Sequence, residues 1–533
     1  MTANPDQQRQ AEETAADRGE QTTEPAASRF LLFQVMPGWM TSFILHLVLI
    51  ILLAIFTFDI SGRVLVSLES GDAPEEISTF EAISFDSLET DVLNENTDVD
   101  VSNESEISEV LAETELETDF EDSMSEFLNS MDSDDSAEMD ANSTMGLLSG
   151  TSNSLSGRKP AQREKLARQN GASPDSENAV KLAMKWIADH QLPDGSWSFD
   201  HRSGPGTHRT SPNPGDFTRA NRAATAMALL VFLGAGQTHV EGDYMETVDR
   251  GLAYLVSSKR ANRFGWSWEE DQGGMYNHGL VSIALCEAYA MTGDVRLLEA
   301  ARQSLRFIEY AQDPYGGGWR YVPRQQGDLS VAGWQIMALK SGKMCGVEVD
   351  SDVIRKSRRF LNFVSSESGS FYGYTHPDVD MRRKGMTAVG LLCQMYLGWT
   401  RENPALQTGV NWLSARGPET GDWKPGMEVP EANKDDFRSG MYYNYYATQV
   451  LSQFGGPQWE KWNQQMRDFL VASQCRQGAA KGSWFFQDPN ELGYVHGGRL
   501  YATTLAAMTL EVYYRYLPLY DDRKTSEAEF ELD

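Results

Sequence analysis

Residues 183–197 read AMKWIADHQLPDGSW, and this stretch decides the fold. Its first half places apolar residues at helical spacing, which predicts an amphipathic helix. A turn with Gly195 and Trp197 follows, and residues 218–236 (TRANRAATAMALLVFLGAG) then form a second run rich in small residues. The pattern predicts two helices joined by a turn that contains glycine and tryptophan.

This unit recurs six times from Ala179 onward. The turn aromatics Trp266, Trp319, Tyr372 and Trp423 are 53, 53 and 51 residues apart. Each second helix carries small residues that permit close approach and should lie inside, whereas each first helix has a charged face and should lie outside. The last unit ends in the aromatic helix TLEVYYRYLPLY, which suits packing against the first unit. We therefore predict an all-α fold, an (α/α)6 toroid of six helix pairs.

The acidity of the chain lies outside this repeat. The 533 residues carry a formal net charge of −31. Between Arg63 and Arg158 there are 26 Asp and Glu and no Lys or Arg, whereas residues 158–520 are nearly neutral. Like charges that repel and few apolar residues predict a disordered linker. Neither part is a basic surface, so we expect no nucleic acid partner.

Residues 39–58, WMTSFILHLVLIILLAIFTF, form an apolar run of 20 interrupted by His46. At about 1.5 Å per residue a helix of this length spans a bilayer of roughly 30 Å. Three arginines precede the run and only Arg63 follows it closely, which favours a cytoplasmic N-terminus and an exported toroid. We expect a single-pass membrane protein that contacts the lipid bilayer through this run.

These features divide the chain into five expected parts. They are a disordered cytoplasmic tail (1–28), a transmembrane region (29–60), an acidic disordered linker (61–173), the toroid domain (174–520) and an acidic tail (521–533). The four cysteines all lie in the toroid, and no CxxC spacing indicates a disulfide framework or a zinc site. We expect no cofactor and no metal.

The repeat resembles that of terpenoid cyclases and protein prenyltransferase β subunits, the prenyltransferase and squalene oxidase repeat. The resemblance covers roughly residues 175–520. In that family the glutamine bonds backbone at neighbouring helix ends, and the tryptophan packs over it. The resemblance therefore implies a structural role as staples of the outer layer for Gln191, Gly195, Trp197, Gln312, Trp319, Gln474 and Trp484.

Function is expected at one end of the toroid, where all connections from outer to inner helices open. Residues near the start of the inner helices should converge there, in a field of helix N-termini that favours anions. The aromatic members either line an apolar pocket or fill the middle of the ring. The candidate rim residues are Arg219, Arg222, Tyr276, Asn277, His278, Asp328, Trp334, His376, Tyr442, Tyr443, Asn444 and His496.

Residues 377–381, PDVDM, resemble the start of the acid motif Asp-x-Asp-Asp of squalene–hopene-type cyclases. The resemblance would make Asp380 the proton donor and Asp378 its support in a terpenoid cyclase-type isomerase or lyase. Met381 occupies the place of the last acid, and the cationic residues that follow favour ionised carboxylates. A metal site built from the three rim histidines with either aspartate is a less favoured interpretation.

The sequence thus favours a membrane-anchored, non-catalytic toroid that binds an apolar small molecule or a protein partner in or around its central cavity. An isoprenoid cyclase is the alternative. A structural protein that tethers the envelope is the second alternative.

Overall fold

The computed structural model of the chain describes residues 155–517 and 519, apart from 379–381 and 489–490. The expected membrane span 39–58, most of the acidic linker, the tail 521–533 and Asp380 lie outside the described residues. None of the helices in the described ranges is long and apolar enough to cross a membrane.

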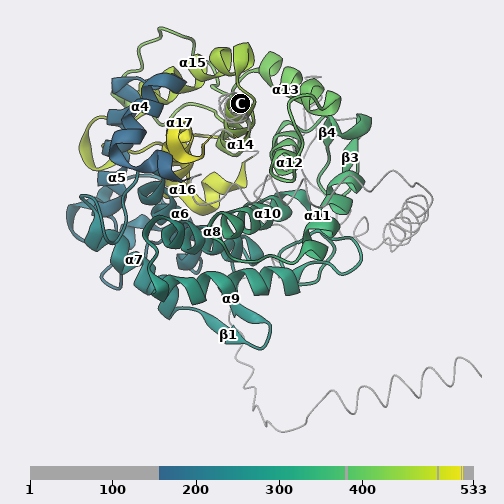
Figure 1. The fold of residues 1–533 in the computed structure, drawn as a ribbon. Helices are drawn as coiled ribbons and strands as arrows, with labels where there is room; N and C mark the ends of the chain where they lie inside the picture. Colours follow the sequence, from purple (N-terminus) through teal and green to yellow (C-terminus); the bar gives the residue numbers. More distant parts are fainter. Residues whose placement is uncertain (1–154, 379–381, 489–490, 518, 520–533) are drawn as a thin grey trace, which may run out of the picture. The chain divides into compact units, whose positions relative to one another are not determined.

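Two concentric rings of helices make up the domain (Figure 1). The outer helices are α5 (Pro174–Asp189), α7 (Met245–Ser257), α9 (Val295–Ala311), α11 (Ser351–Phe363), α13 (Pro404–Arg416) and α15 (Gly456–Ser473). The inner helices are α6 (Asn221–Gly234), α8 (Met275–Thr292), α10 (Leu329–Met344), α12 (Lys384–Tyr396), α14 (Met441–Phe454) and α16 (Leu492–Leu510). The inner helices are buried almost throughout, because alanine, glycine, serine and threonine let them approach one another closely.

The ring is closed. Each inner helix contacts the next one along the chain, and the last, α16, contacts the first, α6. The outer helix α15 likewise contacts α5. In Figure 1 the colours run once round the ring, so that yellow α16 returns to the side of blue α6. The chain therefore forms the six-pair toroid that the repeat predicts.

Glutamine side chains join neighbouring outer helices. Gln191 Nε2 donates a hydrogen bond to the Thr247 carbonyl in α7 over 2.9 Å, and Gln312 makes the equivalent 2.9 Å bond to Val353 in α11. Gln474 Nε2 donates to the carbonyl of Ala179 in α5 over 2.8 Å. This last bond links the sixth outer helix to the first, so the closure of the ring uses the same contact as two of its internal junctions.

A buried tryptophan accompanies each of these junctions. In the first, third and sixth turns its indole N–H donates to a carbonyl near the end of the preceding outer helix. In the second turn Trp268 does this, donating to Leu255 over 2.7 Å, whereas Trp266 is only partly buried. Trp268 is therefore the equivalent of Trp197 in the second unit, although the regular spacing of the turn aromatics points to Trp266. The antiparallel hairpin of β1 (Arg260–Asn262) and β2 (Gly265–Ser267) lengthens this turn and shifts the position.

Short elements occupy the connections from outer to inner helices. They are η4 (His201–Ser203), η5 (Gly206–Thr210), β3 (Ser365–Ser366), η6 (Glu367–Gly369), β4 (Phe371–Tyr372), η7 (Glu431–Asn433) and η8 (Gly478–Ala480). Strands β3 and β4 pair antiparallel. We call the end of the toroid at which the inner helices begin the mouth. Its connections include residues 190–220 and 417–440, whereas Gly455 alone separates α14 from α15 at the opposite end.

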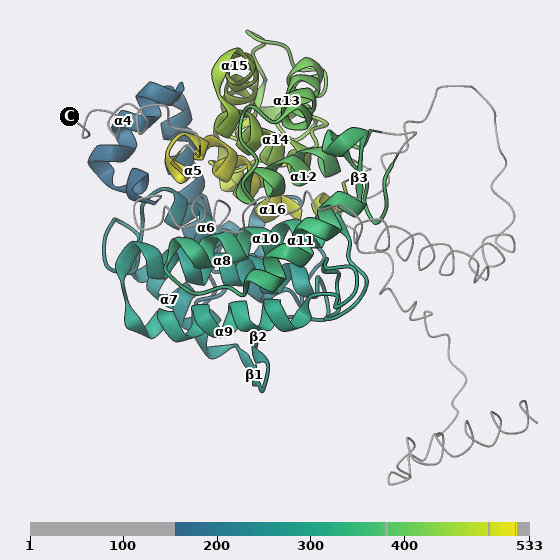
Figure 2. The same ribbon diagram turned by 45° about the vertical axis from the view of Figure 1, so that its right-hand side comes forward.

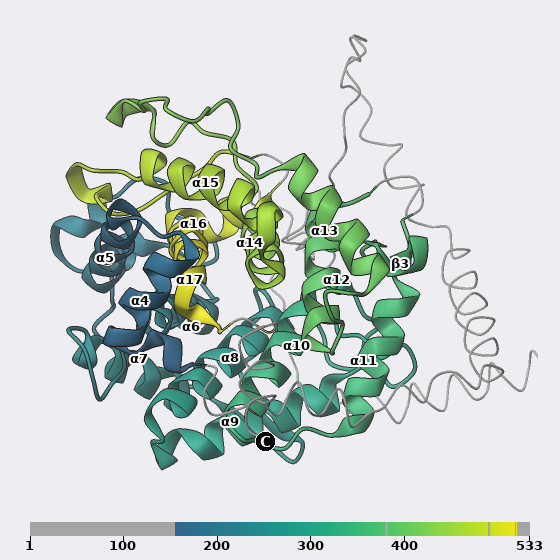
Figure 3. The ribbon, with the colours of Figure 1, turned by 45° about the horizontal axis from the view of Figure 1, so that its top comes forward.

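The end opposite the mouth is covered by segments that flank the repeat. Helix α4 (Pro160–Asn170) follows η3 (Ser156–Arg158) and packs against α17 (Val512–Arg515), next to which it lies in Figures 2 and 3. Asn170 Nδ2 donates to the Tyr513 carbonyl over 2.8 Å. The predicted linker boundary at 173 is therefore wrong for residues 155–173, which fold onto the toroid because they bury apolar and charged side chains there.

Candidate functional site

Three carboxylates lie at the mouth, those of Asp328 and Glu491 buried and that of Glu270 partly buried, and each accepts a hydrogen bond from a backbone N–H at the start of an inner helix. Glu270 accepts from the Arg222 N–H in α6 over 3.0 Å. Asp328 is the N-cap of α10 and accepts from the Val331 N–H over 2.9 Å. Glu491 accepts from an N–H at the start of α14 over 3.2 Å. The first N–H groups of a helix have no partner within it, so these acids have a structural reason to be where they are.

Burial changes the protonation of all three acids. It raises the pKa of Glu270 to about 7, although the Arg222 N–H lowers it in part. Burial raises the pKa of Asp328 to about 6, against the Val331 N–H and the Ser330 hydroxyl. It also raises the pKa of Glu491 well above its usual range. A carboxyl group that keeps its proton near neutral pH can act as an acid, and such groups cluster at functional sites.

Hydroxyl groups surround Asp328 at the start of α10. Tyr276 Oη donates to Ser330 Oγ over 2.5 Å, and Ser330 Oγ donates to Asp328 Oδ1 over 2.7 Å. Tyr442 Oη donates to the Ser330 carbonyl over 3.5 Å. The candidate rim residues Tyr276, Asp328 and Tyr442 are thus brought together around Ser330, which sequence reasoning missed.

Aromatic side chains fill the axis of the ring beneath this cluster. Trp334 of α10 is 4 % exposed, stacks on Tyr445 at a centroid distance of 5.9 Å and meets Tyr446 edge-on at 5.6 Å. Tyr446 in turn lies 5.0 Å from Tyr442. These rings belong to α10 and α14, which both flank α12 in the inner ring, so they meet on its inner side and are core filling at this level of the toroid.

An ion cluster fills the axis at the opposite end. Arg158 lies 2.8 Å from Glu287 of α8, and Arg515 lies 3.4 Å from the same carboxylate and 2.9 Å from Glu511. Tyr516 Oη donates to Glu287 over 2.5 Å. Burial raises the pKa of Glu287, but the two guanidinium groups outweigh it and hold that pKa below its usual value. The cluster therefore keeps Glu287 ionised, and paired charges are the form in which buried charges are tolerated.

The three histidines proposed for a metal have separate partners. His278 is fully buried, accepts from the Trp268 N–H over 3.3 Å and donates to the Ser304 carbonyl over 3.0 Å. His376 is exposed, and its Nδ1 lies 3.0 Å from the hydroxyl of the neighbouring Thr375. His496 bonds Asp216 over 2.8 Å. Within the described ranges no three His, Cys, Asp or Glu side chains are placed to hold a metal ion.

Asp378 is an ion-paired carboxylate. Its Oδ2 accepts from Arg383 Nε over 2.8 Å, just before α12 begins. Asp380, the residue that would donate a proton in a cyclase, lies outside the described residues.

The other rim candidates bind residues of the connections that precede the inner helices. Arg219 is exposed and pairs with Asp271, and Arg222 donates to the Glu269 carbonyl over 2.7 Å. Asn277 Nδ2 donates to Glu270 over 3.0 Å. Two further candidates on α14 point to the connection that precedes it: Tyr443 donates to Gly417, and Asn444 donates to Glu419.

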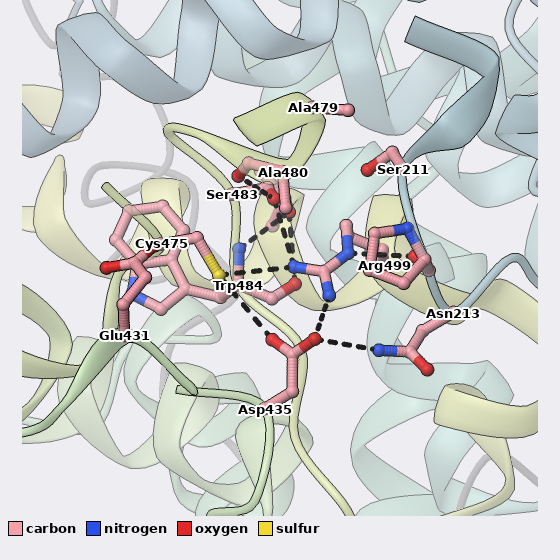
Figure 4. A network of polar contacts seen from close by, with 12 residues as sticks. Ser211, Asn213, Glu431, Asp435, Cys475, Ala479, Ala480, Ser483, Trp484 and Arg499 are labelled. Atoms are coloured by element: carbon pink, nitrogen blue, oxygen red, sulfur yellow. Dashed lines mark hydrogen bonds and ion pairs between the residues drawn. The ribbon is translucent and has the colours of Figure 1, made fainter. Parts of the chain in front are cut away.

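A buried arginine ties three units together at the mouth (Figure 4). Arg499 of α16 donates to the carboxylate of Asp435, to Ser483 Oγ over 3.1 Å and to the Pro212 carbonyl over 2.9 Å. Asn213 donates to the same Asp435 carboxylate over 2.9 Å. The long connections of the first and fifth units are thereby fixed to the sixth inner helix.

Sequence reasoning missed Glu270, Glu491 and the ion cluster. A signal was present for the cluster, since Glu287 stands inside the apolar run SIALCEAYA, and Glu511 and Arg515 are four residues apart in an aromatic helix. A charge within a buried helix needs a partner, and i,i+4 is the spacing at which helical charges pair.

The chain is a closed (α/α)6 toroid by its own contacts. No known protein family and no curated protein matches its sequence. Similar solved structures include the GH76A alpha-1,6-mannanase from Salegentibacter sp. HEL1_6, with 11% identity, 63% of this chain and 98% of that chain covered, and a TM-score of 0.41.

Two further solved structures have a comparable likeness. The type II terpene cyclase MstE from Scytonema shares 12% identity over 64% of this chain and 98% of its own, with a TM-score of 0.41. The cellobiose 2-epimerase from Bacillus thermoamylovorans B4167 shares 11% identity over 62% and 97%, also with a TM-score of 0.41. At these values the likeness does not extend to an activity.

Proposed function

We propose that the domain is a non-catalytic binding module that recognises a protein partner through the loops of its mouth. In this proposal residues 39–58 hold the chain to a membrane, and the axis of the toroid is a solid support. The observation that carries the proposal is the filling of the axis by the protein's own side chains, with Trp334 and Tyr446 at one level and the Glu287 ion cluster at another.

The acids of the mouth fit this proposal. Glu270, Asp328 and Glu491 each bind the N-terminus of an inner helix, which gives them a structural role, and burial accounts for their raised pKa values without a reaction. In a cyclase Asp378 would support the proton donor, and it is instead paired with Arg383. Both features weigh against the isoprenoid cyclase.

The mouth is the favoured surface because of its loops and its exposure. The connections 190–220 and 417–440 are long, and binding residues are disproportionately found on loops held by a rigid scaffold. The opposite end is covered by η3, α4 and α17, which belong to the same chain. Arg499 fixes both long loops to α16, so their backbone is held in place for recognition.

Site-specific photo-crosslinking in cells tests the proposal. A photoreactive amino acid replaces Val495, which is 53 % exposed at the mouth, or Val295, which is 74 % exposed at the opposite end and serves as the matched control. The full chain with the probe at 495 should give a discrete adduct of reproducible mass with one protein, and the probe at 295 should not. Equal labelling from both positions, or none from 495, contradicts the proposal.

Native mass spectrometry of the purified full chain tests the alternative that the domain binds an apolar small molecule in its central cavity. If the protein's own side chains fill the axis, the mass measured after mild removal of the detergent should equal that of the polypeptide alone. A retained isoprenoid or other lipid at one copy per chain would mean that the axis opens, and it would restore the cyclase as a candidate.

A further inference from the structure

Cationic side chains gather where the β1–β2 hairpin lies on the outer helix α9 (Figure 2). The approach is close, because an atom in the Cβ position of Gly265 would lie 2.5 Å from the Gln303 carbonyl oxygen and 2.8 Å from the Phe307 nitrogen of α9. Six cations of the hairpin, of α9 and of the connection before α10 make up what we call the basic face: Lys259, Arg260, Arg263, Arg302, Arg306 and Arg324.

Aromatic rings join these cations into one continuous surface. Phe264, in the hairpin turn, stacks on Tyr310 of α9 at a centroid distance of 3.7 Å. The Arg263 guanidinium lies 4.5 Å from the centre of the Phe264 ring, and that of Arg324 lies 5.6 Å from the centre of the Tyr310 ring. Lys259 lies over the ring of a tryptophan in β2 at 4.8 Å. Cations and rings therefore alternate across the face.

Few carboxylates neutralise the basic face. Glu269, Glu299 and Glu309 lie next to it, and each already accepts a hydrogen bond from another group, over 3.0, 2.9 and 2.9 Å. A fourth acid, Asp313, is buried in a loop to which Arg359 of α11 is bonded. None of the six cations forms an ion pair with another described residue. Six cations against three neighbouring acids leave an excess of three positive charges, although the toroid as a whole is nearly neutral.

The same chain carries an anionic segment of matching composition. Residues 113–127, ETELETDFEDSMSEF, contain seven Asp and Glu, two phenylalanines and no Lys or Arg. We propose that this segment binds the basic face, with its carboxylates on the arginines and its phenylalanines against the ring stack. Guanidinium groups bind carboxylates in a bidentate manner and stack on aromatic rings, so both kinds of side chain in the segment have a counterpart. The inference does not depend on the function proposed for the mouth.

The length of chain between the segment and the toroid suits this contact. Leu155 lines a surface pocket together with Met291, near the end of α8 and four residues before α9 begins at Val295. Arg306 lies eleven residues further along α9, which is about 17 Å at 1.5 Å per residue. In the disordered form that the sequence predicts, the 28 residues from 127 to 155 span about 29 Å. The segment is thereby held near the face at an effective concentration of about 1 mM or more, which favours it over free anionic partners.

Zero-length cross-linking tests the contact. A carbodiimide joins a lysine amine to a carboxylate only where the two groups touch, and Lys259 is the lysine of the basic face. In the purified full chain in a neutral detergent, mass spectrometry should find Lys259 joined to an acid of residues 113–127. The yield should fall about tenfold between 0.05 and 1 M salt, because the screening length shortens from about 14 to about 3 Å.

Charge reversal on α9 supplies the matched comparison. Arg302→Glu combined with Arg306→Glu changes two exposed cations into anions, which turns the excess of three positive charges into an excess of one negative charge. The yield of the Lys259 link should fall about tenfold, because the face would then repel the segment. Lys181→Glu combined with Lys185→Glu reverses two exposed cations at the same spacing on the outer helix α5, and it should leave the yield unchanged.

Four results would overturn the proposal. One is a natural chain in which Lys259 is not joined to residues 113–127, and another is an equal yield after reversal of Arg302 and Arg306. A third is a link between ¹⁵N-labelled and unlabelled chains in a mixture, since a second copy would then supply the segment. The fourth is loss of the link on addition of phosphatidylglycerol vesicles at constant salt, which would mean that the face binds anionic lipid instead. The first, third and fourth use the natural chain, so a variant that fails to fold does not protect the proposal.

Discussion

Replacing Gln474 by leucine removes the contact that closes the outer ring. The side chain is 0 % exposed and donates to the Ala179 carbonyl over 2.8 Å and to the Gly482 carbonyl over 2.9 Å. Each acceptor left without its donor in the interior costs about 1–3 kcal/mol. The Ala179 carbonyl keeps its bond within helix α5 and leucine fills most of the volume, so we expect the free energy of unfolding to fall by about 2–4 kcal/mol.

The same substitution at two other glutamines supplies the comparison. Gln191 and Gln312 each make two bonds of the same kind, with lengths of 2.8–2.9 Å. In a closed ring the three junctions are equivalent, so urea unfolding of the full chain, followed by tryptophan fluorescence, should give similar losses for Gln191→Leu, Gln312→Leu and Gln474→Leu. A loss below about 1 kcal/mol for Gln474→Leu alone would refute the closure of the ring.

Three further substitutions test the axis and the mouth. Trp334→Ala should lower the free energy of unfolding in urea by about 3–5 kcal/mol, because it leaves a cavity in a filled axis; a loss below 1 kcal/mol would indicate an existing pocket. Glu287→Gln should cost about 3–5 kcal/mol by leaving two buried guanidinium groups uncompensated, whereas Glu164→Gln, in an exposed pair, should cost less than about 1 kcal/mol. Asp328→Asn should remove part of the pH dependence of the free energy of unfolding. The folded protein binds this proton more tightly than the unfolded chain, so stability falls by about 2 kcal/mol as pH rises from 4 to 6, and the plot of the free energy of unfolding against pH should be flatter in the variant.

The architecture could be predicted because it depends on local, repeated signals. Small residues on alternate helices assign the inner ring, and the Gln and Gly-x-Trp positions assign the junctions. Gly482 has φ +95 and lies so close to the Leu182 carbonyl that a Cβ atom would collide with it, which is a physical reason for glycine at that place. The error at Trp266 arose because spacing does not register a hairpin that lengthens one turn.

The contents of the axis could not be predicted in the same way. Arg158 and Glu287 are far apart in sequence and meet only because the ring closes and a preceding segment folds onto its end. The roles of the mouth residues depend on side-chain direction. His278 and Tyr276 are two residues apart on α8, yet one bonds the outer helix α9 and the other bonds Ser330 of α10. Position before an inner helix is therefore insufficient to assign a residue to a cavity.

The segments that enter and leave the domain are bonded directly to each other. Arg158 Nε donates to the Arg515 carbonyl over 2.8 Å, although 357 positions separate them. Mechanical tension between the chain before residue 155 and the chain after residue 519 is therefore carried across this contact and the Glu287 carboxylate. Of the twelve ring helices this line of force touches α8 through Glu287, so pulling should detach the two ends from each other well before it stretches the toroid.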